Sequence, residues 1–186
     1  MKKNTFLIAA LLLTSAVTQA LILKPVDGKT EFFAVGRPGM IKINGEGLAP
    51  EGELTIINNL VSGSLTVDMT KLTTKIDLRD EHMKNKYLEV SKYPKAILTF
   101  KDLKLPAELS TFKKETTLPF NGDFTLHGKT NPVSGEMIFS VDKKIVSVNA
   151  VFDVKIIDYL ENLPEWLGMK VAETVKIKTV FNGTTR

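Results

Sequence analysis

The residues with the clearest potential for chemistry in this sequence are its two histidines, His82 and His127. A histidine can act as a general acid or base, or it can bind a metal, but a metal site needs three or four converging ligands. Neither histidine belongs to a short His-x-His or His-x-x-x-His pattern. Surface or capping roles explain both better than coordination does, so we predict no metal-binding residues.

Nucleophilic and phosphate-transfer chemistry has no recognisable motif either. The chain contains no cysteine, and no Gly-x-Ser-x-Gly elbow is present. The segment Ser62-Gly63-Ser64 is better explained by curvature within a strand, and Gly36-Arg37-Pro38-Gly39 lacks the spacing of a phosphate loop. The acidic residues of 77–81 are mixed with basic ones, as on a solvated helix face. We predict no catalytic residues and a protein that is not an enzyme.

The elements that would position any site are mostly strands, because apolar residues recur at every second position. In residues 61–70 the odd positions are apolar apart from Gly63, and the even positions are polar. The same alternation runs through 118–128, 133–139, 146–156 and 171–181, and shorter strands are expected at 30–35, 40–47, 52–57 and 96–103. Many antiparallel strands at short spacing are typical of a barrel or a sandwich.

One segment, Asp77 to Leu88, departs from this alternation and predicts a short amphipathic helix. Its apolar residues recur at helical spacing, and Asp77 is the expected N-cap. The dipeptide Tyr93-Pro94 is expected to close it. A second helical turn is expected at 163–168, and a turn between strands at Thr130-Asn131-Pro132.

The predicted inward faces of the strands are almost wholly apolar. Ordinary core packing explains most of this pattern. An eight-stranded barrel, however, has an interior that is either just filled by side chains or wide enough for one small ligand. Periodicity does not distinguish a filled barrel from a hollow one, so both remain open at this point.

The first twenty residues indicate export. Lys2 and Lys3 precede an unbroken apolar run from Phe6 to Leu13, and Thr18-Gln19-Ala20 offers small residues for a signal peptidase. The run is too short for a permanent bilayer-spanning helix, which needs about 20 apolar residues. We therefore predict a signal peptide at residues 1–20 and one domain at residues 21–186.

Composition narrows the class of protein further. Without Lys2 and Lys3, the net charge falls from +4 to about +2. A nucleic-acid-binding protein is normally much more basic, with Lys and Arg clustered on one face. The absence of cysteine excludes both disulfides and the acylated cysteine of a lipoprotein. We expect a soluble exported protein that binds no nucleic acid and is not anchored in a membrane. Its oligomeric state, a dimer included, stays open.

Three blocks of sequence resemble the bacterial YceI-like family of periplasmic polyisoprenoid-binding proteins. The first runs from Gly63-Ser64-Leu65-Thr66-Val67-Asp68 through Arg79-Asp80-Glu81-His82-Met83 to Tyr93-Pro94-Lys95-Ala96. The second is residues 120–133, and the third is residues 152–177, from Phe152-Asp153-Val154 to Val175-Lys176-Ile177. Together they span nearly the whole of residues 21–186.

This resemblance implies a mainly β fold, an elongated, lipocalin-like, antiparallel barrel of eight strands with a short helix across it. It also implies an apolar tunnel that holds a polyisoprenoid or an isoprenoid quinone, with no required cofactor. The inward positions that we expect to line the tunnel are Phe32, Leu65, Val67, Met69, Met83, Phe100, Phe120, Phe124, Leu126, Met137, Phe139, Phe152 and Val154.

The first strand departs from the family. Relatives carry a histidine after the phenylalanine of this strand, whereas residues 29–38 contain Phe32 and Phe33 but no histidine. Arg37 offers an alternative contact for an anionic head group, although a solvated loop arginine explains it as well. Two other functions remain open: a filled barrel acting as a stress-response or protein-interaction module that docks through residues 77–88, and an enzyme for a lipid-like substrate that uses His82 or His127.

Overall fold

The fold is that of a computed structural model, which describes residues 20–38, 41–112, 115–166 and 168–185. The predicted signal peptide lies outside these described residues, apart from Ala20. Among the described residues, no helix is both long enough and apolar enough to cross a membrane.

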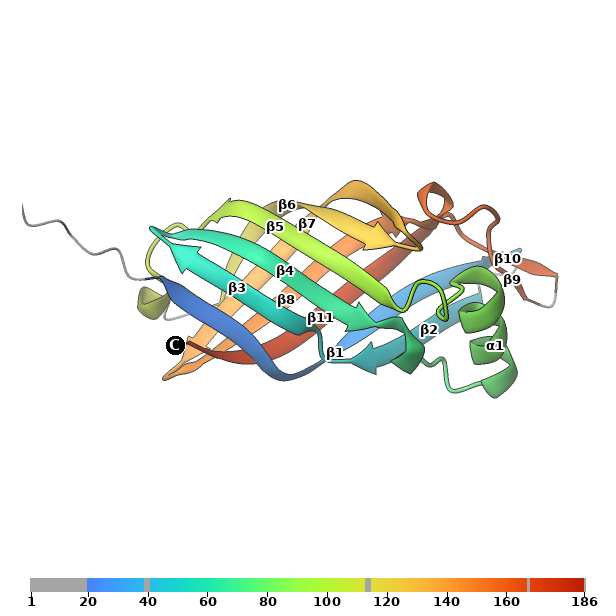
Figure 1. Cartoon of the computed structure of the whole chain (residues 1–186), viewed down its shortest axis with the longest axis horizontal. Helices are drawn as coiled ribbons and strands as arrows, with labels where there is room; N and C mark the ends of the chain where they lie inside the picture. The colour runs from blue at the N-terminus through green and yellow to red at the C-terminus, as the bar shows by residue number, and fades with distance from the viewer. Residues whose placement is uncertain (1–19, 39–40, 113–114, 167, 186) are drawn as a thin grey trace, which may run out of the picture.

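The chain forms an elongated, closed antiparallel barrel with eight strand positions, as predicted (Figure 1). Strand β1 closes the barrel by pairing with β11, from Leu23 opposite Thr185 to Phe33 opposite Lys176. Strands β2 and β3 share one position, because both pair with β1 and only Ala49 and Pro50 separate them. The strands of the barrel are β1 (Leu21–Arg37), β2 (Ile41–Leu48), β3 (Glu51–Ile57), β4 (Leu60–Asp68), β5 (Lys95–Lys104), β6 (Thr116–Leu126), β7 (Lys129–Asp142), β8 (Ile145–Lys155) and β11 (Thr174–Thr185).

The period-two pattern explains why these segments form strands with one face inward. In β8, every second residue from Val146 to Val154 is buried, whereas the residues between them are exposed or half-buried. Strand β1 begins at Leu21, nine residues before the predicted start at Thr30. The apolar alternation did not reveal the first nine residues of β1, because the register of its pairing with β11 shifts between Pro25 and Asp27. Gly28, at φ 141°, also lies so close to β11 that a Cβ would sit 2.1 Å from the Val180 carbonyl oxygen.

A helical segment lies at one end of the barrel, where the sequence predicted it (Figure 1). It consists of α1 (Asp77–Glu81) and a π-helix, η2 (His82–Tyr87), and we call residues 77–87 the roof segment. The predicted N-cap is wrong, because the cap position is Ile76 and Asp77 is already inside the first turn. The part of the chain that the structure describes also contains three short 3₁₀ helices: η1 (Met69–Lys71), η3 (Leu109–Thr111) and η4 (Ile156–Asp158).

Two local predictions are wrong. The described residues of 163–168, which exclude residue 167, contain no helical turn. They begin a small hairpin of β9 (Glu165–Trp166) and β10 (Met169–Val171), which joins β1. The turn expected at Thr130–Pro132 begins three residues earlier, at His127-Gly128, where both φ angles are positive. A two-residue hairpin needs this backbone conformation, and glycine adopts it readily.

Candidate ligand-binding site

The barrel interior contains an apolar cavity of about 170 Å³ at the end that the roof segment covers. An eight-stranded barrel can leave room for one small ligand, and this barrel does so in one half of its length. The cavity is lined by Thr30, Phe32, Ala34, Ile43, Pro50, Leu65, Val67, Met69, Leu72, Thr74, Arg79, His82, Met83, Tyr87, Leu88, Ala96, Leu98, Phe124, Leu126, Phe152, Val154, Ile156, Leu160, Pro164, Glu165, Val171, Val175, Ile177 and Thr179.

Nine of the thirteen residues expected to line a tunnel are among these, namely Phe32, Leu65, Val67, Met69, Met83, Phe124, Leu126, Phe152 and Val154. The other four, Phe100, Phe120, Met137 and Phe139, lie outside the cavity lining and are at most 2% exposed. They fill the opposite half of the barrel, where the Phe100 and Phe120 rings meet edge to face at 5.2 Å. The alternation of apolar residues shows which side chains of a strand point inward. It does not show whether an inward side chain lies beside the cavity or in the filled half of the barrel.

A row of aromatic rings separates the filled half from the cavity. Phe120, in the filled half, contacts Phe152 at 5.9 Å between ring centroids. Phe152 in turn contacts Phe124 at 5.4 Å, and Phe124 contacts Tyr159 at 5.8 Å. Phe124 and Phe152 also line the cavity, so these two rings form its floor. Edge-to-face pairs of this kind add about 0.5–1.5 kcal/mol each beyond their buried area.

The few polar residues of the lining are largely satisfied by one another. The buried hydroxyl groups of Thr30 and Thr179 lie 3.3 Å apart, on the paired strands β1 and β11. Thr179 interrupts the apolar pattern of its strand, and this pairing explains how it is tolerated inside the barrel. A hydrogen-bonded hydroxyl has little remaining cost of burial. The cavity therefore presents an almost wholly apolar surface.

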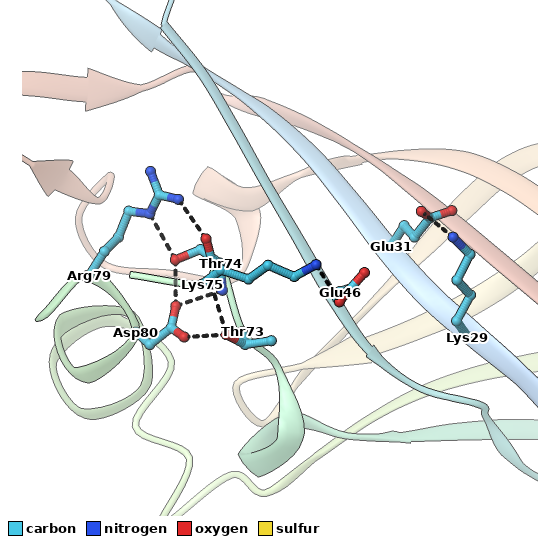
Figure 2. Close-up of polar contacts among 8 residues, drawn as sticks. All are labelled: Lys29, Glu31, Glu46, Thr73, Thr74, Lys75, Arg79 and Asp80. Atoms are coloured by element: carbon cyan, nitrogen blue, oxygen red, sulfur yellow. Dashed lines mark hydrogen bonds and ion pairs between the residues drawn. The ribbon is translucent and has the colours of Figure 1, made fainter. Parts of the chain in front are cut away.

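A carboxylate-centred network fixes the start of the roof segment (Figure 2). Asp80 accepts hydrogen bonds from the Thr73 hydroxyl at 2.6 Å, the Thr74 amide at 2.7 Å and the Thr74 hydroxyl. Arg79 donates from Nε to the Thr74 hydroxyl at 2.8 Å and from Nη2 to the Thr74 carbonyl oxygen at 3.0 Å. Burial by itself raises the pKa of Asp80, but the hydrogen bonds from Thr73 and Thr74 outweigh it and hold that pKa below its usual value.

A second anchor holds the far end of the roof segment. The Tyr87 hydroxyl donates to the Glu165 carbonyl oxygen and accepts from the Glu165 amide, both at 2.9 Å. Tyr87 thus ties the π-helix to β9. On the way into the segment, Thr73 pairs with Glu46 of β2, and Lys75 forms an exposed ion pair with the Glu46 carboxylate at 3.0 Å (Figure 2).

Sequence reasoning missed the residues that the roof segment and its anchors bring to the cavity. Arg79 and Tyr87 reach it from the roof segment, and Leu88 reaches it from the position that follows; periodicity did not show which side of this segment faces the barrel. Leu98 could have been found, because it shares the inward face of β5 with Phe100 and Ala96.

The two histidines have different surroundings. His82 is exposed and lies at the edge of the cavity. His127 is mostly buried, with Nε2 2.6 Å from the Glu89 carboxylate and its ring 4.4 Å from that of Tyr93. Within the described part of the chain, no three His, Cys, Asp or Glu side chains converge as a metal site would require. Arg37 is exposed at the end of β1 and does not line the cavity.

A closed antiparallel barrel with an apolar cavity defines a lipocalin-like architecture. The YceI-like domain matches residues 16–182, and the chain belongs to this family.

Solved structures of low sequence identity share the fold. A polyisoprenoid-binding domain from Saccharophagus degradans is 15% identical, with a TM-score of 0.69 over 89% of this chain and 98% of that one. BcnA from Burkholderia cenocepacia is also 15% identical, with a TM-score of 0.64 over 84% and 96%. The YceI protein of Campylobacter jejuni is 12% identical, with a TM-score of 0.57 over 78% and 88%. No curated protein matches the chain in sequence.

Proposed function

We propose that this protein binds a long apolar molecule, a polyisoprenoid or an isoprenoid quinone, and sequesters or carries it through the periplasm. The observation that supports this proposal most directly is the apolar cavity beneath the roof segment. Membership of the YceI-like family and the structural likeness to a polyisoprenoid-binding domain agree with it. The signal-like pattern of residues 1–20 supports export as part of the same proposal.

The lining supplies the free energy that such a ligand requires. Each methylene group that moves from water into an apolar site contributes about 0.8 kcal/mol. Polar groups that could oppose this transfer are few, and Thr30 and Thr179 satisfy each other. A binding protein needs no more chemistry than this apolar lining offers.

The size of the cavity limits how the ligand can bind. A dry cavity of about 150 Å³ accepts a benzene-sized molecule, so about 170 Å³ suits roughly one five-carbon unit. A longer chain therefore has to separate the lining or extend past the roof segment. Met69 and Met83 contribute flexible side chains to the lining, and such side chains repack readily around different shapes.

A series of prenols of increasing length tests the proposal, with binding measured by calorimetry on the purified protein. We expect affinity to rise with each isoprene unit until the accessible space is full. The variant Ala96→Phe places a benzene-sized ring in the cavity, since Ala96 is buried in its lining. It should weaken binding at least tenfold and leave the protein folded.

Thr99→Phe is the matched control, because Thr99 is exposed on the same strand, β5. It adds the same ring outside the barrel and should bind prenols like the unmodified protein. The proposal is wrong if no prenol binds, or if folded Ala96→Phe binds as tightly as Thr99→Phe.

A further inference from the structure

A second pocket, of about 670 Å³, adjoins the apolar cavity and differs from it in chemistry. The two share Tyr87, Leu160 and Glu165 as lining residues, so they are neighbours across a common wall. We call the second one the polar pocket. An amphiphile with its tail in the apolar cavity could place a head group here across this shared wall.

The polar pocket is built from side chains that are held in place. Its inner side carries His127, which the hairpin turn His127-Gly128 positions against Glu89 and Tyr93. A Cβ on Gly128 would sit 2.6 Å from the Tyr93 ring, so glycine is needed for this packing. At the rim, the Lys86 ammonium lies 5.3 Å from the centre of the Tyr87 ring.

The charges of the polar pocket nearly cancel. Its lining has three carboxylates, Glu89, Glu161 and Glu165, against two ammonium groups, Lys86 and Lys92, and the imidazole of His127. The carboxylates therefore at least equal the cationic groups in number. A diphosphate head, with several negative charges, would be repelled by these carboxylates. An uncharged head with oxygen atoms can accept hydrogen bonds from the lysines, and a hydroxyl can donate to a carboxylate.

We propose that the polar pocket is the head-group subsite and that it selects an uncharged, oxygen-bearing head, such as a quinone or an alcohol, over a phosphorylated one. This inference rests on the proposed function, because it assumes that an apolar tail occupies the neighbouring cavity. It assigns tail and head to two adjoining sites with Tyr87 between them.

The test compares three probes with the same fifteen-carbon chain: a hydrocarbon without a head, the alcohol farnesol, and farnesyl diphosphate. At low ionic strength, where surface charges are least screened, we expect farnesol to bind at least tenfold more tightly than farnesyl diphosphate. The double variant Lys86→Ala/Lys92→Ala should lose affinity for farnesol several-fold and retain its affinity for the hydrocarbon.

The variant Glu161→Lys provides a gain of function. It reverses one charge in the pocket and should raise the affinity for farnesyl diphosphate about five- to tenfold, with little change for the hydrocarbon. Glu136→Lys is the matched control, because Glu136 is exposed on β7 and outside the pocket; it should change neither affinity.

The possible failures are distinguishable. If the hydrocarbon binds but neither the head group nor any pocket variant alters affinity, the subsite is refuted and the apolar cavity stands. Equal or tighter binding of the diphosphate by the unmodified protein refutes the selection of an uncharged head. If none of the three probes binds, the proposed function itself is refuted, and the subsite with it.

Discussion

At the scale of single residues, Asp80 fixes the start of the roof segment through hydrogen bonds to two threonines. Its carboxylate organises Thr73 and Thr74, and Thr74 in turn accepts from Arg79. Hydrogen bonds to a charged partner contribute about 1.5–3 kcal/mol each, and an unpaired buried donor costs a similar amount. The connection between the barrel and its roof segment therefore depends strongly on one ionised group.

Replacement of Asp80 should destabilise the protein in a pH-dependent way. At neutral pH we expect Asp80→Asn to lower the free energy of unfolding by about 1–3 kcal/mol. Because the folded-state pKa of Asp80 lies below its unfolded value, its stabilising contribution is present above about pH 4 and is lost as pH falls through the folded pKa. Urea unfolding at several pH values measures the difference, which should shrink in acid.

The control for this prediction is Asp77→Asn, on an exposed residue of the same helix. It should change the stability by no more than about 0.5 kcal/mol. An equal loss in both variants, or a difference for Asp80→Asn that does not shrink as the pH is lowered, would contradict the role of the network.

A second residue-scale prediction concerns Gly45, which lies opposite Phe32 in the register of β1 and β2. A Cβ at Gly45 would sit 2.3 Å from the Phe32 ring and 2.8 Å from the Thr73 carbonyl oxygen. Gly45→Ala should therefore cost about 1–3 kcal/mol and displace Phe32 from its place in the cavity lining. Thermal unfolding and prenol affinity should both fall.

Gly36→Ala tests whether the effect is specific to that position. A Cβ at Gly36 meets its nearest neighbour, Ile43 Cδ1, at 3.5 Å, an ordinary contact. This variant on the same strand pair should lose much less stability than Gly45→Ala. Similar losses would show that any side chain on these strands is disruptive and that the packing of Phe32 is not the cause.

From the sequence we could predict which residues point into the barrel, but not whether each one lines the cavity or packs in the filled half. Phe124 and Phe120 occupy equivalent inward positions on β6, yet one lines the cavity and the other is packed in the filled half. Their difference arises from which side chains of distant strands they meet, and a periodic pattern contains no such information. Asp80 was assigned to a solvated helix face for the same reason.

At the scale of elements, the roof segment is tied to the barrel by a polar anchor near each end. The Asp80 network holds its beginning, and the two hydrogen bonds between Tyr87 and Glu165 hold its end. Between these anchors, Met83 packs half-buried against the core. A segment with few buried contacts can open locally at modest cost. We therefore predict that ligands enter and leave through the roof segment.

Loss of the Tyr87 anchor should accelerate this exchange. Tyr87→Phe keeps the ring in the cavity wall and removes both hydrogen bonds to Glu165, at a cost of about 1 kcal/mol. If opening limits release, a prenol should dissociate about fivefold faster, and amide hydrogen exchange in residues 82–90 should rise. Unchanged dissociation and unchanged exchange would show that ligands enter and leave elsewhere.

The helical element was predictable, whereas its attachment was not. Helical spacing between Leu78 and Leu88 placed it correctly, because that signal is local. Its attachment to the barrel uses contacts between residues far apart in the chain, Thr73 with Glu46 and Tyr87 with Glu165. The short strand β9 was mistaken for a helical turn, since a two-residue strand has no period to detect and exists only through its partner β10.

At the scale of the whole molecule, the barrel is divided into a packed half that provides stability and a cavity half that provides space. Among the largest fully buried side chains are Phe100, Phe120, Phe139 and Phe181, and none of these lines the cavity. The inward periodicity is the same in both halves. This division reconciles the two interpretations that the sequence left open, a filled barrel and a hollow one.

The boundary between the halves should determine which chain lengths the protein accepts. Phe120 contacts Phe152, which forms part of the cavity floor, so Phe120→Ala should extend the cavity into the filled half. A truncation of this kind costs about 3–5 kcal/mol. In protein that remains folded, longer prenols should gain affinity relative to shorter ones, as measured by the ratio of their dissociation constants.

Phe139→Ala separates the effect of position from the effect of lost stability. On β7, Gly135 is paired with both Phe120 and Phe152. Phe139 lies four residues further along the same strand, about 13 Å from Gly135. Its truncation should destabilise the barrel by a similar amount, but the new void is too remote to join the cavity. The ratio of affinities should then stay unchanged. If both variants shift the ratio equally, general loosening of the barrel sets the chain length, and the aromatic floor does not.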